Sequence, residues 1–175
     1  DLTLGDILRE AAEDCPERPA LITGESDPAD RRQWTYAELY ADALVVARAL
    51  GERFEPGERI AVWAPNIPEW ILLEFGSALA GTILVTVNPA YQPEEVAYVL
   101  GQSRSAGIFV LPHYRGNPML ESVEKVRGQC PDLREVIRFD EWADFMESGR
   151  KSEAELPQVS PGDACMIQYT SGTTG

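Results

Sequence analysis

The stretch RIAVWAPNIPEWILLEFGSALAGTILVTV, residues 59–87, decides the fold of this chain. It opens and closes on short apolar runs, RIAVWA (59–64) and TILVTV (82–87), which have the composition and length of strands covered on both faces. Between the two runs, Pro68 suits the first turn of a helix that we expect to reach Ala80, and Gly81 suits its end. The stretch therefore predicts a strand, a buried helix and a second strand.

Residues 70–87 also approach the length of a membrane-spanning helix, which needs about 20 mostly apolar residues. However, Glu74 places a charge inside this segment, Gly81 interrupts it, and β-branched residues crowd its second half. These three features favour a buried helix followed by a strand, so we expect no transmembrane segment.

The same alternation of strand-like and helix-like segments runs along the rest of the chain. Further strands are expected at 20–23, 107–111, 135–139 and 164–170, with an edge strand at 33–36 after a polar loop at 24–32. Further helices are expected after Thr3, after a capping box formed by Thr35 and Glu38, from Pro93, at 118–128 and at 141–147.

Strands that alternate with helices at this spacing predict an α/β fold, with a mostly parallel sheet and helices on both faces. We interpret residues 1–175 as a single, incomplete α/β subdomain. Within it, the polar segment 148–161 is expected to be a linker before the last strand. The first residue is Asp1 rather than Met, which is consistent with a piece of a longer or processed chain.

The charge of the chain argues against several classes of partner. Acidic residues number 29 and basic residues 15, so the formal net charge is −14. Such an acidic chain is poorly suited to bind nucleic acid or an anionic lipid surface, because both attract Lys and Arg. If an anion such as ATP binds, backbone N–H groups and hydroxyls have to hold it.

The cysteines and the single histidine offer no framework for disulfides or a metal. Cys15, Cys130 and Cys165 are odd in number and widely spaced, which indicates reduced thiols and a cytoplasmic location. His113 has no second histidine with which to form a metal site or a catalytic pair, so we interpret it as a loop residue. Cys165 falls on the last predicted strand, where we expect an inert, buried thiol.

Other chemically interesting residues have structural interpretations. Residues 66–69 fit a turn followed by a helix start, and Glu94 and Glu95 fit the first turn of the next helix, whose dipole favours negative charge. The loop NPAY, residues 88–91, leaves the end of a strand and could therefore border a site. We expect the four tryptophans to be packing residues: Trp34, Trp63, Trp70 and Trp142. We assign no catalytic residue and no metal ligand.

The chain ends on YTSGTTG, residues 169–175, a run of hydroxyl-bearing side chains and glycines after the last predicted strand. In open α/β sheets, ligands bind beyond the carboxyl ends of the strands. Consecutive N–H groups in a glycine-containing turn form an anion-binding nest, and hydroxyls add further donors. The candidate phosphate-binding residues are therefore Thr170, Ser171, Gly172, Thr173, Thr174 and Gly175.

The same residues also allow an ordinary loop and exclude one common type of phosphate-binding loop. Composition alone favours an ordinary solvated loop, because clusters of Gly, Ser and Thr are typical of loops. The run also lacks the lysine that a Walker A loop requires, which argues against a P-loop kinase or GTPase.

The run YTSGTTG resembles the phosphate-binding signature of the adenylate-forming superfamily, which includes acyl-CoA synthetases, adenylation domains of peptide synthetases and beetle luciferases. Three more stretches resemble this family in the same order along the chain: WTYAEL (34–39), RIAVWAPNIPEW (59–70) and ALAGTILVTVNPAYQPEEVAYVL (78–100). The NPAY form at 88–91 is more similar to acyl-CoA synthetases for fatty or aryl acids than to domains that adenylate amino acids.

The resemblance implies that the chain is the N-terminal portion of an acyl-CoA synthetase, cut inside its ATP loop. Such an enzyme is an AMP-forming acid–thiol ligase. A carboxylate attacks the α-phosphate of ATP, pyrophosphate leaves, and CoA then displaces AMP to give a thioester. The resemblance assigns residues 170–175 to the ATP phosphates, with Mg²⁺ and CoA as cosubstrates of the parent protein.

For the isolated chain, we expect no activity and no tightly bound cofactor. We also expect self-association through an apolar surface that the rest of the parent protein covers. The residues leave one alternative open, which is a non-enzymatic α/β scaffold or association module.

Overall fold

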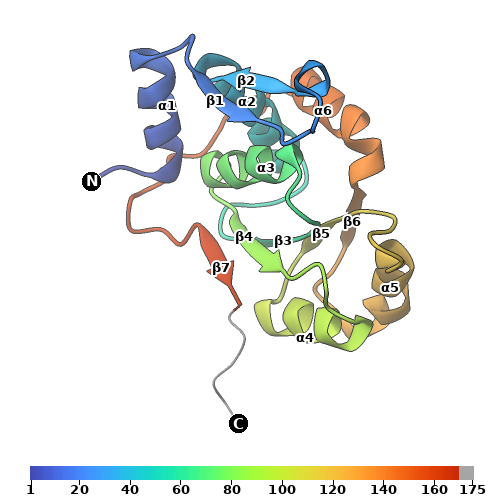
Figure 1. Ribbon diagram of the computed structural model, residues 1–175. Coiled ribbons are helices and arrows are strands. Elements are labelled where there is room, and N and C mark those ends of the chain that lie inside the picture. Colours follow the sequence, from blue (N-terminus) through green and yellow to red (C-terminus); the bar gives the residue numbers. More distant parts are fainter. Residues whose placement is uncertain (170–175) are drawn as a thin grey trace.

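The computed structural model describes residues 1–169 and contains two sheets (Figure 1). The larger sheet has five strands in the order β6-β5-β3-β4-β7, and every neighbouring pair is parallel. Its strands are β3 (Arg59–Trp63), β4 (Ile83–Val87), β5 (Gly107–Val110), β6 (Glu135–Arg138) and β7 (Met166–Gln168). The predicted α/β fold with a mostly parallel sheet is confirmed.

Helices cover both faces of the parallel sheet (Figure 1). On one face lie α2 (Tyr36–Gly51), α3 (Pro68–Leu79) and α6 (Trp142–Lys151), with α1 (Leu4–Asp14) packed beside them. On the other face lie α4 (Pro93–Ser103) and α5 (Met119–Val126). Three short 3₁₀ segments are η1 (Pro28–Asp30), η2 (Arg127–Gln129) and η3 (Phe139–Glu141).

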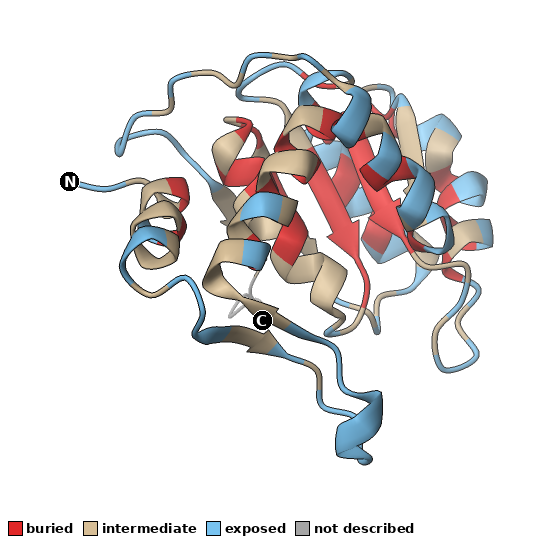
Figure 2. Ribbon diagram, turned by 90° about the horizontal axis from the view of Figure 1, so that it is seen from above, coloured by how far each residue is buried: buried red, intermediate tan, exposed pale blue. Residues whose placement is uncertain are grey.

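Successive residues of a strand point to opposite faces, and in β3, β4 and β5 both faces are buried. In β3, Ile60 and Val62 join the core beneath α2 and α3, whereas Ala61 and Trp63 join the core beneath α4 and α5. All four side chains are fully buried, and Figure 2 shows the central strands enclosed between helices. This two-sided burial explains why these strands appear in the sequence as continuous apolar runs.

The stretch 59–87 forms the predicted unit β3–α3–β4. Gly81, after the end of α3, has a φ of +69°, a backbone conformation that glycine adopts without steric cost. Gly76 lets α3 approach α2, because a Cβ at this position would lie 2.3 Å from Cγ1 of Val46. None of the helices within residues 1–169 combines the length and the apolar character that crossing a membrane requires.

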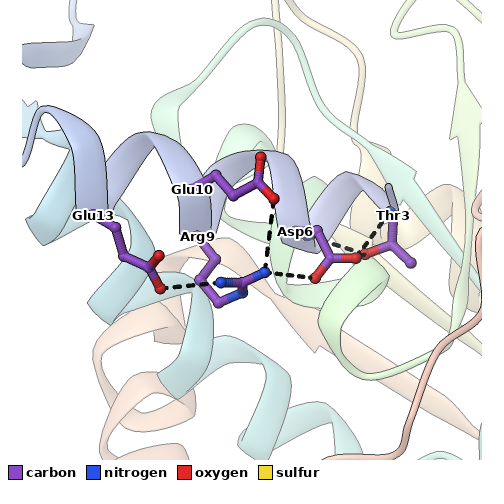
Figure 3. Close-up of polar contacts among 5 residues, drawn as sticks. All are labelled: Thr3, Asp6, Arg9, Glu10 and Glu13. Carbon is purple, nitrogen blue, oxygen red and sulfur yellow. Dashed lines mark hydrogen bonds and ion pairs between the residues drawn. The ribbon is translucent and has the colours of Figure 1, made fainter. Parts of the chain in front are cut away.

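Capping boxes that begin with a threonine start α1 and α2. At α1, Oγ1 of Thr3 accepts a hydrogen bond from the Asp6 N–H at 3.0 Å, and the Asp6 carboxylate accepts one from the Thr3 N–H at 3.0 Å (Figure 3). Arg9 pairs with Asp6 and Glu13 along the same helix (Figure 3). The box predicted for α2 from Thr35 and Glu38 is confirmed. Both boxes satisfy backbone donors that a helix start leaves unpaired.

The expectation of a doubly covered parallel strand at 20–23 is wrong. These residues belong to β1 (Pro19–Ile22), which pairs antiparallel with β2 (Gln33–Thr35) outside the parallel sheet. Ile22 is 52% exposed. The connection between the two strands is too short for the crossover of roughly a dozen or more residues that a parallel pair requires, so the two strands form a hairpin.

Two differences concern the last third of the chain. α6 continues to Lys151, past the expected end at 147, because Gly149 lets it lie close against α2; a Cβ there would be 2.1 Å from the Val45 carbonyl oxygen. The polar segment therefore begins at Ser152. Cys165 precedes β7 and is exposed, so the prediction of a buried thiol is wrong. Within residues 1–169, β7 is an edge strand paired with β4 alone, which leaves its start uncovered.

Candidate functional site: two clefts at the carboxyl edge of the sheet

The carboxyl ends of β3, β4 and β7 meet at one edge of the sheet and open into a cleft of about 810 Å³. We call it the strand-end cleft. α3 and the loops that follow β3 and β4 form its walls. Its lining includes Asn66, Trp70, Glu74, Thr86, Asn88 and Tyr169. Ligands of open α/β sheets bind at this kind of position, beyond the carboxyl ends of the strands.

The loop after β4 is a preformed wall of this cleft. Nε1 of Trp63, whose ring is fully buried, donates a hydrogen bond to the Asn88 carbonyl at 2.9 Å. Oδ1 of Asn88 accepts from the Ala90 N–H at 2.9 Å, and the Glu95 carboxylate accepts from the Gln92 N–H at 2.8 Å. Short polar side chains that bond to nearby backbone fix a turn in this way.

Among the described side chains that line the strand-end cleft, two are carboxylates and none is a cation. The carboxylates are Glu74 of α3 and Glu95 of α4. Burial raises the pKa of the Glu74 carboxyl above its ordinary value, because desolvation disfavours the charged form. A polyphosphate in this cleft would therefore need positive charge that the described lining does not supply.

Tyr169 connects the end of β7 to α4. Its hydroxyl donates to the Val99 carbonyl at 3.4 Å, and its ring packs into the core beneath α4. Burial raises the pKa of the phenol. The predicted phosphate-binding residues follow directly and lie outside the described residues: Thr170, Ser171, Gly172, Thr173, Thr174 and Gly175. The structure thus places the residue before that run on the lining of the strand-end cleft.

A second cleft of about 630 Å³ adjoins the first, and Asn66, Asn88 and Pro89 line both. We call it the turn cleft, because the turn 114–117 forms its far wall. Among the described residues that line it, Arg115 is the single charged side chain. The two clefts therefore carry opposite charge on either side of a shared wall.

The structure brings some of the residues singled out in the sequence to the clefts. Asn66, Trp70 and the loop 88–91 line them, whereas Glu69 forms an ion pair with Arg32 at 2.8 Å. His113 is exposed, as expected of a loop residue. Packing roles are confirmed for Trp63, which is fully buried, and for Trp142, which contacts the rings of Phe109, Phe139 and Phe145.

Other lining residues were not identified from the sequence as part of a site. Glu74 was detectable in the sequence, because it is the lone charge within an apolar segment. That charge served as an argument against a membrane span and was not interpreted as part of a site. Thr86 and Gln168 lie within strands and carry no distinguishing pattern. Arg115 precedes a glycine in a polar loop, a context that many surface arginines share.

Comparison with known proteins shows the family of this chain. The family described as AMP-binding enzyme matches residues 8–175, and the chain therefore belongs to that family. It is 29% identical to a medium-chain acyl-CoA ligase, ACSF2, mitochondrial, of Danio rerio, over 99% of this chain and 32% of that protein. The chain spans about a third of the length of the relatives it matches, with coverage of 36% and 32% in two of them.

Solved structures show the same fold. The N-terminal domain of FACL13 from Mycobacterium tuberculosis matches with a TM-score of 0.82 and 26% identity, over 98% of this chain and 42% of that chain. The anthranilate CoA ligase AuaEII, in complex with anthranoyl-AMP, also matches with a TM-score of 0.82 and 26% identity, over 99% of this chain and 32% of that chain. The fold is thus that of the N-terminal domain of acyl-CoA synthetases.

Proposed function

We propose that the complete protein containing this chain is an AMP-forming acyl-CoA ligase. A carboxylate oxygen attacks the α-phosphorus of ATP and expels pyrophosphate, and the thiol of CoA then attacks the acyl carbon and expels AMP. The observation that carries the proposal is that YTSGTTG starts, at Tyr169, on the lining of a cleft at the carboxyl ends of β3, β4 and β7.

In this proposal, the described residues shape the site and residues 170–175 contact the ATP phosphates. The cleft volume of about 810 Å³ is within the range of pockets that hold drug-sized ligands, which is roughly 300–1,000 Å³. Glu74 and Glu95 make its lining unfavourable for bare phosphate, and in this proposal the backbone N–H groups and hydroxyls of 170–175 supply the phosphate donors. This division fits a chain with a formal charge of −14.

The residues that hold Mg²⁺ are not proposed from this part of the chain. Within residues 1–169, no group of three or more His, Cys, Asp or Glu side chains is arranged to hold a metal ion. When bound, Mg²⁺ supplies charge neutralisation for the phosphates of ATP.

For the substrate, we propose a fatty or aryl carboxylic acid. The support is the NPAY form of the loop 88–91, together with the names of the relatives, one a medium-chain acyl-CoA ligase and another an anthranilate CoA ligase. The isolated 175 residues are proposed to be inactive and to bind ATP weakly, because they span only about a third of the length of the relatives. Isothermal titration that gives a micromolar affinity of the isolated chain for ATP would contradict this part of the proposal.

The proposed function is tested by carboxylate-dependent exchange of labelled pyrophosphate into ATP. The complete protein is assayed with acetate, medium- and long-chain fatty acids, benzoates and amino acids, and the isolated chain serves as the control. We expect exchange with one class of fatty or aryl acid and none from the isolated chain. Absence of exchange with every acid would refute the proposal and favour a non-enzymatic scaffold.

A further inference from the structure

A groove of about 620 Å³ lies between the hairpin of β1 and β2 and the start of α3, which are neighbours in Figure 1. We call it the hairpin groove. Four of its apolar side chains also pack against the core beneath α2 and α3, so the groove has an apolar floor. The apolar residues among its described lining are Leu21, Ile22, Ile67, Pro68, Trp70 and Ile71.

The charged residues of the described lining belong to the hairpin. They are Glu25 and Arg32. Arg32 forms an ion pair with Glu69 at 2.8 Å, which connects the hairpin to the first turn of α3 and neutralises the arginine. The Arg32 guanidinium also lies 5.6 Å from the centre of the Trp34 ring. An ion pair thus joins the two walls of the groove, and the side chains left to contact a ligand are mostly apolar.

Ile22 of β1 keeps a large apolar side chain at the surface. It is 52% exposed, whereas the apolar side chains of β3 are fully buried. A single exposed apolar residue is common, but Ile22 shares the groove with five other apolar side chains. An apolar surface that has polar residues at its rim is typical of a binding site. The hairpin groove therefore has the character of a site for an apolar ligand.

The hairpin groove is continuous with the strand-end cleft, because Asn66 and Trp70 line both. Trp70 lies in the first turn of α3, is partly buried, and donates its backbone N–H to the Ile67 carbonyl at 3.0 Å. Its indole is therefore a wall between the two spaces. A ligand that begins in the strand-end cleft reaches the hairpin groove by passing Trp70.

The two spaces that adjoin the strand-end cleft differ in chemistry. The turn cleft carries Arg115 and amide side chains, including Gln92 and Asn117, whereas the hairpin groove is mostly apolar. In the proposed reaction, the carboxylate of the acid lies near the start of the phosphate-binding run, which follows Tyr169 on the strand-end cleft. An alkyl chain that leaves this cleft is removed from water in the hairpin groove without burying polar groups of the protein.

We propose that the hairpin groove binds the alkyl chain of the carboxylic acid substrate and that Trp70 controls which chains enter it. This inference rests on the proposed function, and it narrows the substrate from fatty or aryl acids to fatty acids. Each methylene group that the groove buries strengthens binding roughly fourfold, so affinity rises with chain length until the groove is filled. The proposal gives Trp70 a part in selecting the acid and none in the chemical steps.

The test uses Ile22→Asp in the complete protein, with Ile7→Asp as the matched control. Ile22 and Ile7 are 52% and 53% exposed, so each variant adds one carboxylate at nearly equal exposure, and of the two residues it is Ile22 that lines the groove. Because neither side chain is buried, both variants are expected to fold. Dissociation constants of butyrate, octanoate, laurate and benzoate are measured by isothermal titration, and pyrophosphate exchange with each acid is measured in parallel.

We expect wild type to bind laurate more tightly than octanoate, and octanoate more tightly than butyrate. Ile22→Asp should raise the dissociation constant of laurate roughly 10-fold or more, the effect of losing a methylene contact in an apolar pocket. The same variant should leave butyrate and benzoate within about twofold of wild type, and Ile7→Asp should do so for every acid, as expected of surface substitutions away from a site.

Trp70→Ala tests the wall between the two spaces. Removal of the indole widens the passage, so the exchange rate with a fatty acid that ends in a phenyl ring should rise relative to the rate with laurate. This ratio does not depend on how much of the variant is folded. An unchanged ratio would show that Trp70 does not control entry to the groove.

Unchanged affinity of Ile22→Asp for laurate would overturn the inference, and a changed mass of that variant in light scattering would then identify a second copy of the chain as the occupant. Equal losses for every acid would also overturn it, because they would reflect the fold and not the alkyl chain. Tighter binding of benzoate than of laurate by wild type would refute the inference alone, since exchange with benzoate leaves the proposed function intact. Failure of the proposed function is read separately, as absence of wild-type exchange with every acid.

Discussion

Replacing Trp63 by phenylalanine tests how the core holds the site. The indole of Trp63 ends β3, is fully buried beneath α4, and donates to the Asn88 carbonyl at 2.9 Å. It is therefore the direct link between the sheet and the loop that separates the two clefts. Phenylalanine keeps an aromatic ring at this position but loses the N–H donor and two buried carbons.

The expected cost follows from these two losses. Two buried carbons contribute about 1.6 kcal/mol to the free energy of unfolding, at roughly 0.8 kcal/mol each. A carbonyl left without its donor in a partly buried position costs about 1 kcal/mol more. The sum of about 3 kcal/mol corresponds to a fall in Tm of roughly 6–12 °C for a chain of this size.

Urea denaturation of wild type and Trp63→Phe measures this loss, with Trp34→Phe as the control. Trp34 also donates a hydrogen bond, from Nε1 to an Asp42 carboxylate oxygen at 3.0 Å, but it is only partly buried. We expect the urea midpoint of Trp63→Phe to fall clearly below that of wild type. The free energy of unfolding of Trp34→Phe should fall by less than about 1 kcal/mol, and both variants should keep the m-value of wild type. Equal losses in the two variants would refute the reasoning that burial and the bond to Asn88 make Trp63 a structural anchor.

Further predictions concern charge, packing and association. Burial raises the pKa of Glu74 in the folded state, so its ionisation lowers stability as the pH rises through that pKa. Glu74→Gln should therefore raise the unfolding temperature at about pH 7, and should raise it less at about pH 4, which is below the ordinary glutamate pKa of 4.5. Equal effects at both pH values would contradict this expectation. Gly76→Ala should destabilise the chain by about 1–3 kcal/mol, because its Cβ would meet Val46 at 2.3 Å. Gly101→Ala, on the open side of α4, should leave stability unchanged or raise it. Calorimetry that finds Gly101→Ala the less stable of the two would disprove the close packing of α2 on α3. The edge strand β7 should make the isolated chain self-associate, and light scattering that shows a monomer at high concentration would exclude this.

The parts of the fold that were predictable share a physical cause. The strands β3, β4 and β5 are buried on both faces, so burial selects an apolar residue at nearly every position and the runs are easy to detect. Thr35 and Glu38 start α2 through local hydrogen bonds that the sequence displays directly. The hairpin of β1 and β2 was missed because its pairing depends on a short connection rather than on composition.

The site was less predictable than the fold. Its recognised signature, 170–175, lies outside the described residues, and those six residues remain a prediction. The clefts are formed by side chains from separate segments, such as Glu74 of α3 and Arg115 of the turn, that come together only when β3, β4 and α3 take their places. The exposure of Cys165 was also invisible in the sequence, because it depends on which side of β7 has a neighbouring strand.

The most direct test of the central claim follows the carboxylate oxygens through a single turnover. The complete protein is supplied with ATP, CoA and an acid labelled with ¹⁸O in both carboxylate oxygens, and the products are analysed by mass spectrometry. Attack of the carboxylate on the α-phosphorus predicts AMP that carries one ¹⁸O and unlabelled pyrophosphate. Label in inorganic phosphate with formation of ADP, or AMP without label, would contradict an acyl-adenylate and with it the function proposed for this protein.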